Sequence, residues 1–318
     1  MTDTTDTTRR GLLGAAAAGL ATVAATRSAT AQEAPAASPR FADRHVLITG
    51  ATSGIGEGTA RAFAAEGAKV SFNGRRAEMG ERIAAEINAD PAVQASGGGA
   101  FYMQSDVREE AQIVDFVRAA TEYYGPFHVA FNNAGVVFGN GSLTGNGPLA
   151  EIEAADFDDV WATNGRGVFL SMKHEIPVML GNEPWGRHGL RGVIVNNASV
   201  SAHGGFPGIG PYSTSKHGVL GLTRGAALDY GMQGIRINSI SPGGVDTPMR
   251  RASIEAQGND PDEAQAPNVR HTTNTVTEMA DVVMFLAMGD APSSIQGTDL
   301  DVTMGMLTGP FAPPNPNT

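Results

Sequence analysis

Three side chains with complementary proton chemistry lie close together in the second half of this chain. Ser199 precedes Tyr212, and Lys216 follows Tyr212 by about one helical turn. A phenol has an ordinary pKa of about 10, so it exchanges protons poorly near neutral pH. A neighbouring ammonium favours the phenolate and lowers that pKa, which lets the phenol exchange a proton with a carbonyl or alcohol oxygen. This chemistry accompanies hydride transfer with a nicotinamide, provided that the chain binds one.

A glycine-rich turn near the start of the chain predicts such a dinucleotide site. The apolar run His45–Thr49 leads directly into Gly50-Ala-Thr-Ser-Gly-Ile-Gly56, and the alanine-rich stretch Thr59–Glu66 comes next. This is the order of strand, turn and helix that a dinucleotide fingerprint requires. The glycines let a pyrophosphate approach the backbone, and the first N–H groups of the helix can bind that anion.

The motifs that follow make the chain similar to the short-chain dehydrogenase/reductase family in its shorter-subunit form, over residues 40–308. The matching segments, in order, are Thr49–Gly56, Asp106-Val107, Asn132-Asn-Ala-Gly135, Asn164, Ser199 with Tyr212 and Lys216, and Pro242-Gly243 with Thr247. The resemblance implies an NAD(P)-dependent enzyme that acts on the CH–OH group of its donor. It also implies one doubly wound (Rossmann) parallel α/β sheet of about seven strands with helices on both faces.

The resemblance assigns a role to each of four catalytic residues. Tyr212 would give or take the proton, and Lys216 would lower the pKa of the phenol and bind the nicotinamide ribose. Ser199 would donate a hydrogen bond to the substrate oxygen, and Asn164 would hold a water that links Lys216 to solvent. The implied cofactor contacts are Gly50, Thr52, Ser53, Gly54, Ile55, Gly56, Arg75, Arg76, Asp106, Val107, Asn133, Ala134, Gly135, Tyr212, Lys216, Pro242, Gly243, Val245 and Thr247.

The end of the second predicted strand favours NADP as the cofactor. An acidic residue at this point would bind the ribose hydroxyls and repel a 2′-phosphate, but the position holds Gly74, and Arg75 and Arg76 follow. Guanidinium groups suit phosphate recognition. NAD remains the alternative, since Arg-bearing turns of this family sometimes accept both cofactors.

Strand and helix signals alternate along the chain, as expected for a parallel sheet covered by helices. The predicted strands are 45–49, 69–73, 100–104, 128–132, 192–197, 236–240 and 298–302. The predicted helices are 77–88, 109–124, 156–180 with a kink or break at Pro177, 212–230 and 276–288. Ligands bind at the carboxyl ends of such strands. The residues at or just past these ends, which should share one crevice, are Gly50, Gly74, Asp106, Asn133, Ser199 and Gly243.

The N-terminal segment has the pattern of an export signal. Arg9 and Arg10 precede a Gly/Ala/Leu run from Gly11 to Ala25, which is shorter than the about 20 apolar residues that span a bilayer. The small residues of Ala29–Ala31 then offer a cleavage site. We expect a twin-arginine signal peptide (residues 1–31), a linker (32–40), a catalytic domain (41–309) and a C-terminal tail (310–318). The exported protein would be periplasmic or secreted, without a stable membrane anchor; the alternative is a cytoplasmic protein with a disordered tail.

Composition limits the partners and the chemistry further. The formal net charge of -11 argues against a nucleic-acid surface, and the absence of Cys excludes disulfides and thiolate metal sites. The seven His residues form no spaced metal-binding pair, so we expect no catalytic metal. By resemblance, Met249–Pro267 should cover the substrate, and Phe206, Ile209 and Met249 hint at an apolar pocket. Asp299 and Asp301 alternate along the last strand and should face solvent.

Two further readings of function stay open at this point. The chain could be a non-catalytic dinucleotide-binding protein, although a protein that only binds would not need Tyr212. It could also be an exported enzyme whose cofactor stays bound and is recycled by a second substrate. In the leading reading it acts on a small carbonyl or alcohol and forms a homodimer or homotetramer through the helices bearing Asn164 and Tyr212.

Overall fold

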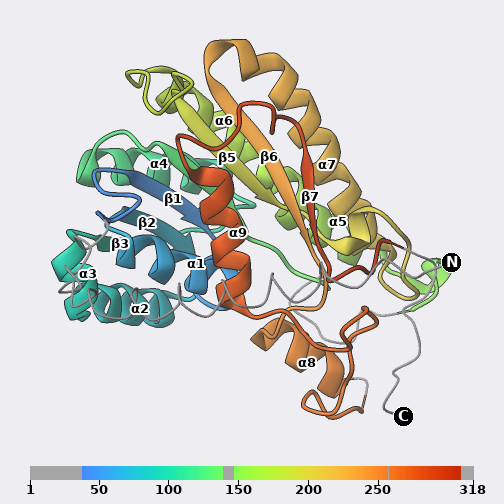
Figure 1. The fold of residues 1–318 in the computed structure, drawn as a ribbon. Helices are drawn as coiled ribbons and strands as arrows, with labels where there is room; N and C mark the ends of the chain where they lie inside the picture. Colours follow the sequence, from blue (N-terminus) through green and yellow to red (C-terminus); the bar gives the residue numbers. More distant parts are fainter. Residues whose placement is uncertain (1–37, 139–146, 257, 309–318) are drawn as a thin grey trace, which may run out of the picture. The chain divides into compact units, whose positions relative to one another are not determined.

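A parallel sheet forms the centre of the computed structural model, which describes residues 38–138, 147–256 and 258–308. Seven strands within these ranges pair in the order β3-β2-β1-β4-β5-β6-β7 (Figure 1). Their bounds are β1 His45–Thr49, β2 Lys69–Gly74, β3 Gly99–Gln104, β4 Val129–Asn132, β5 Gly192–Asn197, β6 Ile235–Pro242 and β7 Asp299–Val302. The order changes direction between β1 and β4, so the predicted doubly wound fold is confirmed.

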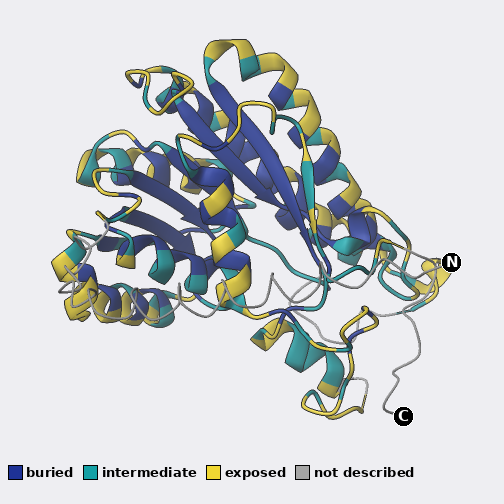
Figure 2. Ribbon diagram, in the orientation of Figure 1, coloured by how far each residue is buried: buried dark blue, intermediate teal, exposed yellow. Residues whose placement is uncertain are grey.

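Helices cover both faces of this sheet because its strands bury apolar residues on both sides (Figure 2). Along β1, Val46 and Ile48 face α1 and α9, whereas Leu47 faces the opposite layer, as the two-residue period of a strand requires. The helices are α1 Gly54–Ala65, α2 Ala77–Ala89, α3 Pro91–Ser96, α4 Glu110–Tyr124, α5 Ala154–Trp161, α6 Gly167–Leu180, α7 Gly210–Tyr230, α8 Pro248–Ala256 and α9 Val276–Ala287. The elements α1, α2, α3 and α9 cover one face, and α4, α6 and α7 cover the other.

The long helical stretch after residue 154 differs from the prediction. Pro177 does not break it, because this proline lies in the last turn of α6, where few backbone bonds remain to be lost. The interruption instead is a π-helical turn at Ala162–Arg166, which separates α5 from α6 and contains Asn164. Single π-helical turns inside α-helices are frequent at functional sites.

The sequence analysis missed two short helices. In α3, Pro91 opens the helix and the Asp90 carboxylate accepts a hydrogen bond from the Ala92 N–H at 2.8 Å. The other is α8, which lies inside the segment expected to cover the substrate. Both helices are too short to show a full apolar repeat, which is the pattern from which helices are predicted.

A polar cluster is buried between the sheet and helices α6 and α7. The Asn132 side-chain N–H group donates to Glu175 and to Asn196, both at 3.0 Å, and Asn196 donates to Thr223 at 2.9 Å. Burial raises the pKa of Glu175 to about 8, while the bond from Asn132 opposes this rise. Glu175 is therefore largely a neutral acid at pH 7, and no unpaired charge has to be buried here.

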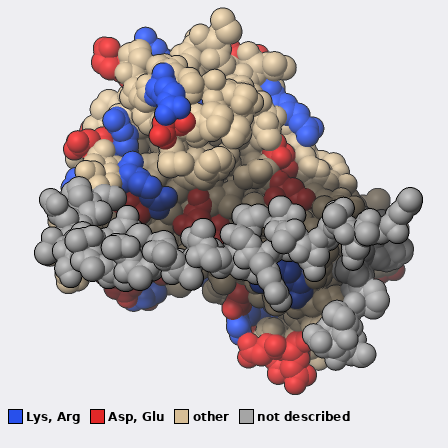
Figure 3. Space-filling model, viewed as in Figure 1, with Lys and Arg blue, Asp and Glu red and all other residues tan. Residues whose placement is uncertain are grey.

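The predicted signal peptide, residues 32–37 of the predicted linker and the predicted C-terminal tail lie outside the described residues. From Pro39 onward the described chain belongs to one compact unit. Within the described ranges, no helix has both the length and the apolar character needed to cross a membrane. Acidic and basic side chains are interspersed over the described part of the face shown in Figure 3.

Candidate active site

A cavity of about 1140 Å³ lies at the carboxyl ends of the strands. All six residues that the sequence placed at strand ends line it: Gly50, Gly74, Asp106, Asn133, Ser199 and Gly243. The expected single crevice therefore exists. In the described part of the chain, no three His, Asp or Glu side chains are grouped so that they could hold a metal ion.

Most of the predicted site residues share this cavity. Its lining includes Gly50, Thr52, Ser53, Gly54, Ile55, Arg75, Arg76, Asp106, Val107, Asn133, Ala134, Gly135, Ser199, Tyr212, Lys216, Pro242, Gly243, Val245 and Thr247. Two predicted residues, Gly56 and Asn164, lie behind the cavity wall, and each serves the site through its neighbours.

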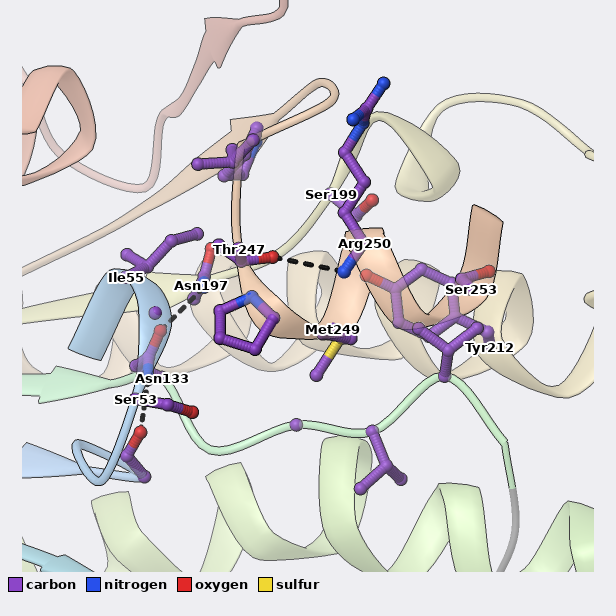
Figure 4. A pocket seen from close by; sticks show the side chains of 18 of the residues that line it. Ser53, Ile55, Asn133, Asn197, Ser199, Tyr212, Thr247, Met249, Arg250 and Ser253 are labelled. Carbon is purple, nitrogen blue, oxygen red and sulfur yellow. Dashed lines mark hydrogen bonds between the residues drawn. The ribbon is translucent and has the colours of Figure 1, made fainter. Parts of the chain in front are cut away.

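The Ser–Tyr–Lys set is brought together by β5 and α7. Figure 4 shows Ser199 and Tyr212 of this set. Tyr212 lies in the first turn of α7, and the Nζ atom of Lys216 is 5.6 Å from the centre of its ring. This ammonium also donates a hydrogen bond to the carbonyl of Asn197, the last residue of β5, at 2.7 Å. Ser199 follows β5, and its hydroxyl accepts a hydrogen bond from the Ser201 N–H at 3.1 Å.

The pKa of Tyr212 differs from the sequence prediction. Burial raises this pKa, and a hydrogen bond with Ser199 opposes the rise without cancelling it. The prediction that the pKa of Tyr212 is lowered overall by Lys216 is therefore wrong for this arrangement. The phenolate loses hydration on burial, and this effect outweighs those that favour the phenolate. Burial also lowers the pKa of Lys216 to about 8. Near neutral pH Tyr212 is thus a neutral phenol, which is the form that can donate a proton.

Asn164 is fully buried in the π-helical turn, and its side chain joins two parts of the site. Its Oδ1 accepts from the Val136 N–H and its Nδ2 donates to the Val136 carbonyl, both at 2.8 Å. The same Nδ2 donates at 3.0 Å to Ser215, whose hydroxyl donates to the Tyr212 carbonyl at 2.7 Å. Asn164 therefore positions the loop after β4 and the first turn of α7. Its role in holding a water stays a prediction.

The glycine turn is shaped to admit a pyrophosphate. Gly50 and Gly54 have φ angles of +70° and +60°, which residues with a side chain rarely adopt. The Ser53 side chain makes no capping bond to α1, so the first N–H groups of this helix can bind an anion. A Cβ atom on Gly56 would lie 2.5 Å from the Asn133 amide nitrogen and 2.6 Å from the Gly50 carbonyl oxygen, so Gly56 permits close packing beneath the turn.

Two asparagines that the sequence analysis missed hold this turn in place. The Asn73 Oδ1 accepts from the Gly50 N–H at 3.1 Å. Asn197 donates to the Asn133 Oδ1 at 3.0 Å, and Asn133 in turn donates to the Thr49 and Gly50 carbonyls. Asn73 and Asn197 are polar residues near the ends of buried strands, and that position was the signal that could have identified them.

The end of β2 carries the groups that would meet the adenosine ribose. A Cβ atom on Gly74 would lie 2.6 Å from the Thr52 methyl group, so an acidic side chain has no room at this position. The Arg76 guanidinium donates to the hydroxyl groups of Thr52, at 3.0 Å, and Ser53, at 2.6 Å. Asp106, the predicted adenine contact, already pairs with Arg108 at 2.6 Å.

Helix α8 and residues 259–267 contribute to the lining, as the predicted covering segment should. Ile209 and Met249 line the cavity, whereas Phe206 is not part of the lining, which leaves it a loop role. Asp299 does not face solvent as predicted. Its side chain is 5% exposed and accepts from Ser239 at 2.5 Å, because β7 pairs with β6 and places this carboxylate beside the β6 hydroxyls. His203 lies 2.6 Å from the other oxygen of Asp299.

The fold and the site together define a nicotinamide-dependent dehydrogenase. The chain belongs to the short-chain dehydrogenase family, whose model matches residues 44–258. It is 38% identical over 267 residues to levodione reductase of Leifsonia aquatica, covering 79% of this chain and 90% of that protein. It is 36% identical over 251 residues to 2-(R)-hydroxypropyl-CoM dehydrogenase of Xanthobacter autotrophicus, covering 78% and 92% respectively.

A solved structure of levodione reductase superposes with a TM-score of 0.73 at 35% sequence identity, covering 85% of this chain and 99% of the other. These similarities show an NAD(P)-dependent oxidoreductase that acts on alcohol or ketone groups.

Proposed function

We propose that this protein is an NADP-dependent oxidoreductase that exchanges a hydride between the nicotinamide and a ketone or secondary alcohol, with Tyr212 as the general acid/base. One observation supports this most directly. The Tyr212 phenol, hydrogen-bonded to Ser199 and beside Lys216, lines the same cavity as the glycine turn at Gly50–Gly56.

The arrangement favours a simple division of labour in carbonyl reduction. The nicotinamide, when bound, supplies the hydride to the carbonyl carbon. The phenol of Tyr212 gives its proton to the carbonyl oxygen, and Ser199 donates a hydrogen bond to that same oxygen. Lys216, held by the Asn197 carbonyl, keeps a positive charge near the tyrosinate that is left behind. In alcohol oxidation each transfer runs in reverse.

The groups at the end of β2 support the preference for NADP. The Thr52 methyl group excludes an acidic side chain at position 74, and that acid is what would otherwise repel a 2′-phosphate. Arg76 is already held at the glycine turn by Thr52 and Ser53, and Arg75 is exposed on the rim of the same cavity. A phosphate at this place would meet two guanidinium groups without large rearrangement.

Association into a homodimer, or a tetramer built from it, is supported by α5 and α7. A Cβ atom on Gly221 or Gly225 of α7 would meet nothing within 4 Å, so this helix has open space along that line. Trp161 at the end of α5 is 38% exposed and packs against Gly218 of the same line. A second copy could therefore approach closely and bury the indole.

We also propose export of the mature enzyme by the twin-arginine route, with residues 1–31 removed. The paired Arg9 and Arg10 and the apolar run after them support this. Replacing both arginines with lysine should leave the enzyme in the cytoplasm of the producing cell. Fractionation of the envelope tests it: an equal yield of the arginine and lysine forms outside the cytoplasm would contradict the proposal.

The catalytic proposal is tested by following NADPH and NADH oxidation with the purified domain over a panel of ketones, beside Tyr212→Phe. We expect turnover that is faster with NADPH and falls about 10²–10⁴-fold in the variant. The variant should still bind NADPH, because the glycine turn and the other cofactor contacts that line the cavity are retained. Tight NADPH binding without turnover in either direction would instead favour a protein that binds a dinucleotide without catalysis.

A further inference from the structure

Arg250 has an unusual position among the arginines of the site. Its backbone N–H donates to the Thr247 hydroxyl at 3.2 Å (Figure 4), which fixes the start of α8. Its Nη2 donates to the Ala264 carbonyl at 3.0 Å, and its Nε lies 3.5 Å from the place of a Cβ atom on Gly244. Ala264, Gly244 and Arg250 all line the cavity. The guanidinium is therefore held on the cavity wall, between the end of β6 and residues 259–267.

No carboxylate in the described residues forms an ion pair with Arg250. Burial lowers the pKa of Arg250, and the charge of Asp246 opposes this effect without cancelling it. Both oxygens of Asp246 already pair with Arg251, at 2.7 and 3.1 Å, and Arg251 also pairs with Asp262 at 2.9 Å. Arg251 is therefore neutralised by acids at the surface, whereas the adjacent Arg250 keeps a charge at the cavity that no carboxylate of the described residues pairs with.

Two acidic residues of the segment 259–267 do not provide Arg250 with a counterion. Asp260 and Glu263 line the cavity, yet both are exposed, and neither approaches Arg250 within ion-pair distance. The Asp260 Oδ1 instead accepts a hydrogen bond from the Asp262 N–H at 2.8 Å. A partly buried cation without a counterion is costly, and an oxyanion from a ligand would offset that cost with charge-assisted hydrogen bonds.

We propose that Arg250 binds an anionic group of the substrate, so that the substrate is a ketone or secondary alcohol that also carries a carboxylate or a similar oxyanion. This rests on the proposed function, because it deepens the specificity of the same site. The planar guanidinium, with four N–H groups left after its bond to Ala264, suits a carboxylate better than a neutral polar group.

A pair of ketones matched in size tests the inference: 4-oxocyclohexanecarboxylate and its methyl ester. Binding is measured by calorimetric titration of the protein loaded with NADP⁺, which cannot reduce a ketone, and turnover is measured by NADPH oxidation. We expect the wild-type protein to bind the carboxylate more tightly than the ester. Arg250→Met should weaken carboxylate binding and raise its KM by about 10–100-fold, with the ester changed less than about twofold. Arg250→Lys, which keeps the charge, should recover part of the loss.

Arg251→Met is the matched control, because this neighbouring arginine pairs only with surface acids; both ketones should respond to it equally. Equal losses for carboxylate and ester in Arg250→Met would reduce Arg250 to a support for Ala264 and overturn the inference. A lower affinity of Arg250→Met for NADPH itself would assign the anion to a cofactor phosphate and also overturn it. So would failure of the wild-type protein to bind the carboxylate. Carboxylate binding without turnover would count against the proposed function alone.

Discussion

Asn164 and Val136 are joined by two hydrogen bonds of 2.8 Å, in which the amide side chain satisfies both the N–H and the C=O of one backbone unit. The bonds link the π-helical turn between α5 and α6 to the loop that follows β4. That loop carries Asn133, Ala134 and Gly135 along the cavity. The position of this cavity wall therefore depends on a residue that does not itself line the cavity.

Replacing Asn164 with leucine should therefore lower both stability and activity. Two partly buried backbone groups of Val136 would lose their partners, at a cost of about 0.5–1.5 kcal/mol each in the free energy of unfolding. We expect kcat to fall while the mutant still folds, as urea denaturation and steady-state kinetics would show. Asn88→Leu is the control, since Asn88 makes the same two bonds with Ala100, far from the cavity, at 2.9 and 2.8 Å. A kcat unchanged by Asn164→Leu would contradict the positioning role.

Arg76→Met should change the choice of cofactor. The variant loses the guanidinium that Thr52 and Ser53 hold at the glycine turn, so the Kd for NADPH should rise about 10–100-fold. The Kd for NADH should change little, because NADH has no 2′-phosphate. Fluorescence titration with both cofactors measures the effect. Parallel losses for NADPH and NADH would show that Arg76 supports the turn without recognising phosphate.

Glu175 should make the stability of the protein depend on pH. Burial raises the pKa of Glu175 in the folded protein to about 8 from an ordinary value of 4.5. Between these two pH values the folded protein keeps the proton, whereas the unfolded chain releases it. The free energy of unfolding should therefore fall as pH rises from about 4.5 to 8, by up to about 1.4 kcal/mol per pH unit, and level off above that.

Glu175→Gln should remove this slope, because glutamine keeps an acceptor for the Asn132 amide and does not ionise in this range. Chemical denaturation at a series of pH values gives the comparison. Glu122→Gln, on the exposed surface of α4, should leave the slope intact. Identical pH profiles for the wild-type protein and Glu175→Gln would mean that Glu175 does not titrate in this window.

Gly221→Arg should separate the subunits without unfolding them. A Cβ atom at this position meets nothing within 4 Å in a single chain, so an arginine fits the isolated fold. In a dimer packed through α7 the same side chain would hold the two helices apart. Analytical ultracentrifugation should then show a smaller species for Gly221→Arg than for the wild-type protein. The melting temperature should fall only by as much as the interface contributes to stability. Glu122→Arg on α4 serves as the control, and an unaltered mass for Gly221→Arg would exclude this interface.

The sequence predicted the strands and the crevice well because both follow from short local patterns. Apolar runs that end in Gly, Asn or Asp identify buried strands and their carboxyl ends, so six strand-end residues could be assigned to one cavity. The π-helical turn at Ala162–Arg166 could not be predicted in this way. Over a single turn, apolar spacing does not distinguish a π-helix from an α-helix, and the predicted break was assigned to Pro177 instead.

Contacts between distant residues were the other source of error. Alternation along β7 placed Asp299 toward solvent, but its partners Ser239 and His203 lie about 60 and 96 residues away in the chain. The prediction of a lowered pKa for Tyr212 was wrong for a related reason. Spacing along α7 shows that Lys216 is near, whereas the burial that dominates depends on every segment packed around the phenol.

The two Asn-Asn pairs at the ends of β4 and β5 serve opposite sides of one sheet. Asn132 and Asn196 are paired in register and face the buried Glu175, while the side chains of Asn133 and Asn197, one residue later, brace the glycine turn. Because successive residues of a strand point to opposite faces, a slip of one residue would leave an asparagine in only one of the two roles and put an apolar residue in the other. Depending on the direction of the slip, either the polar core would lose an amide or the cofactor turn would lose its brace, so misaligned pairing of these strands is penalised in folding or in function.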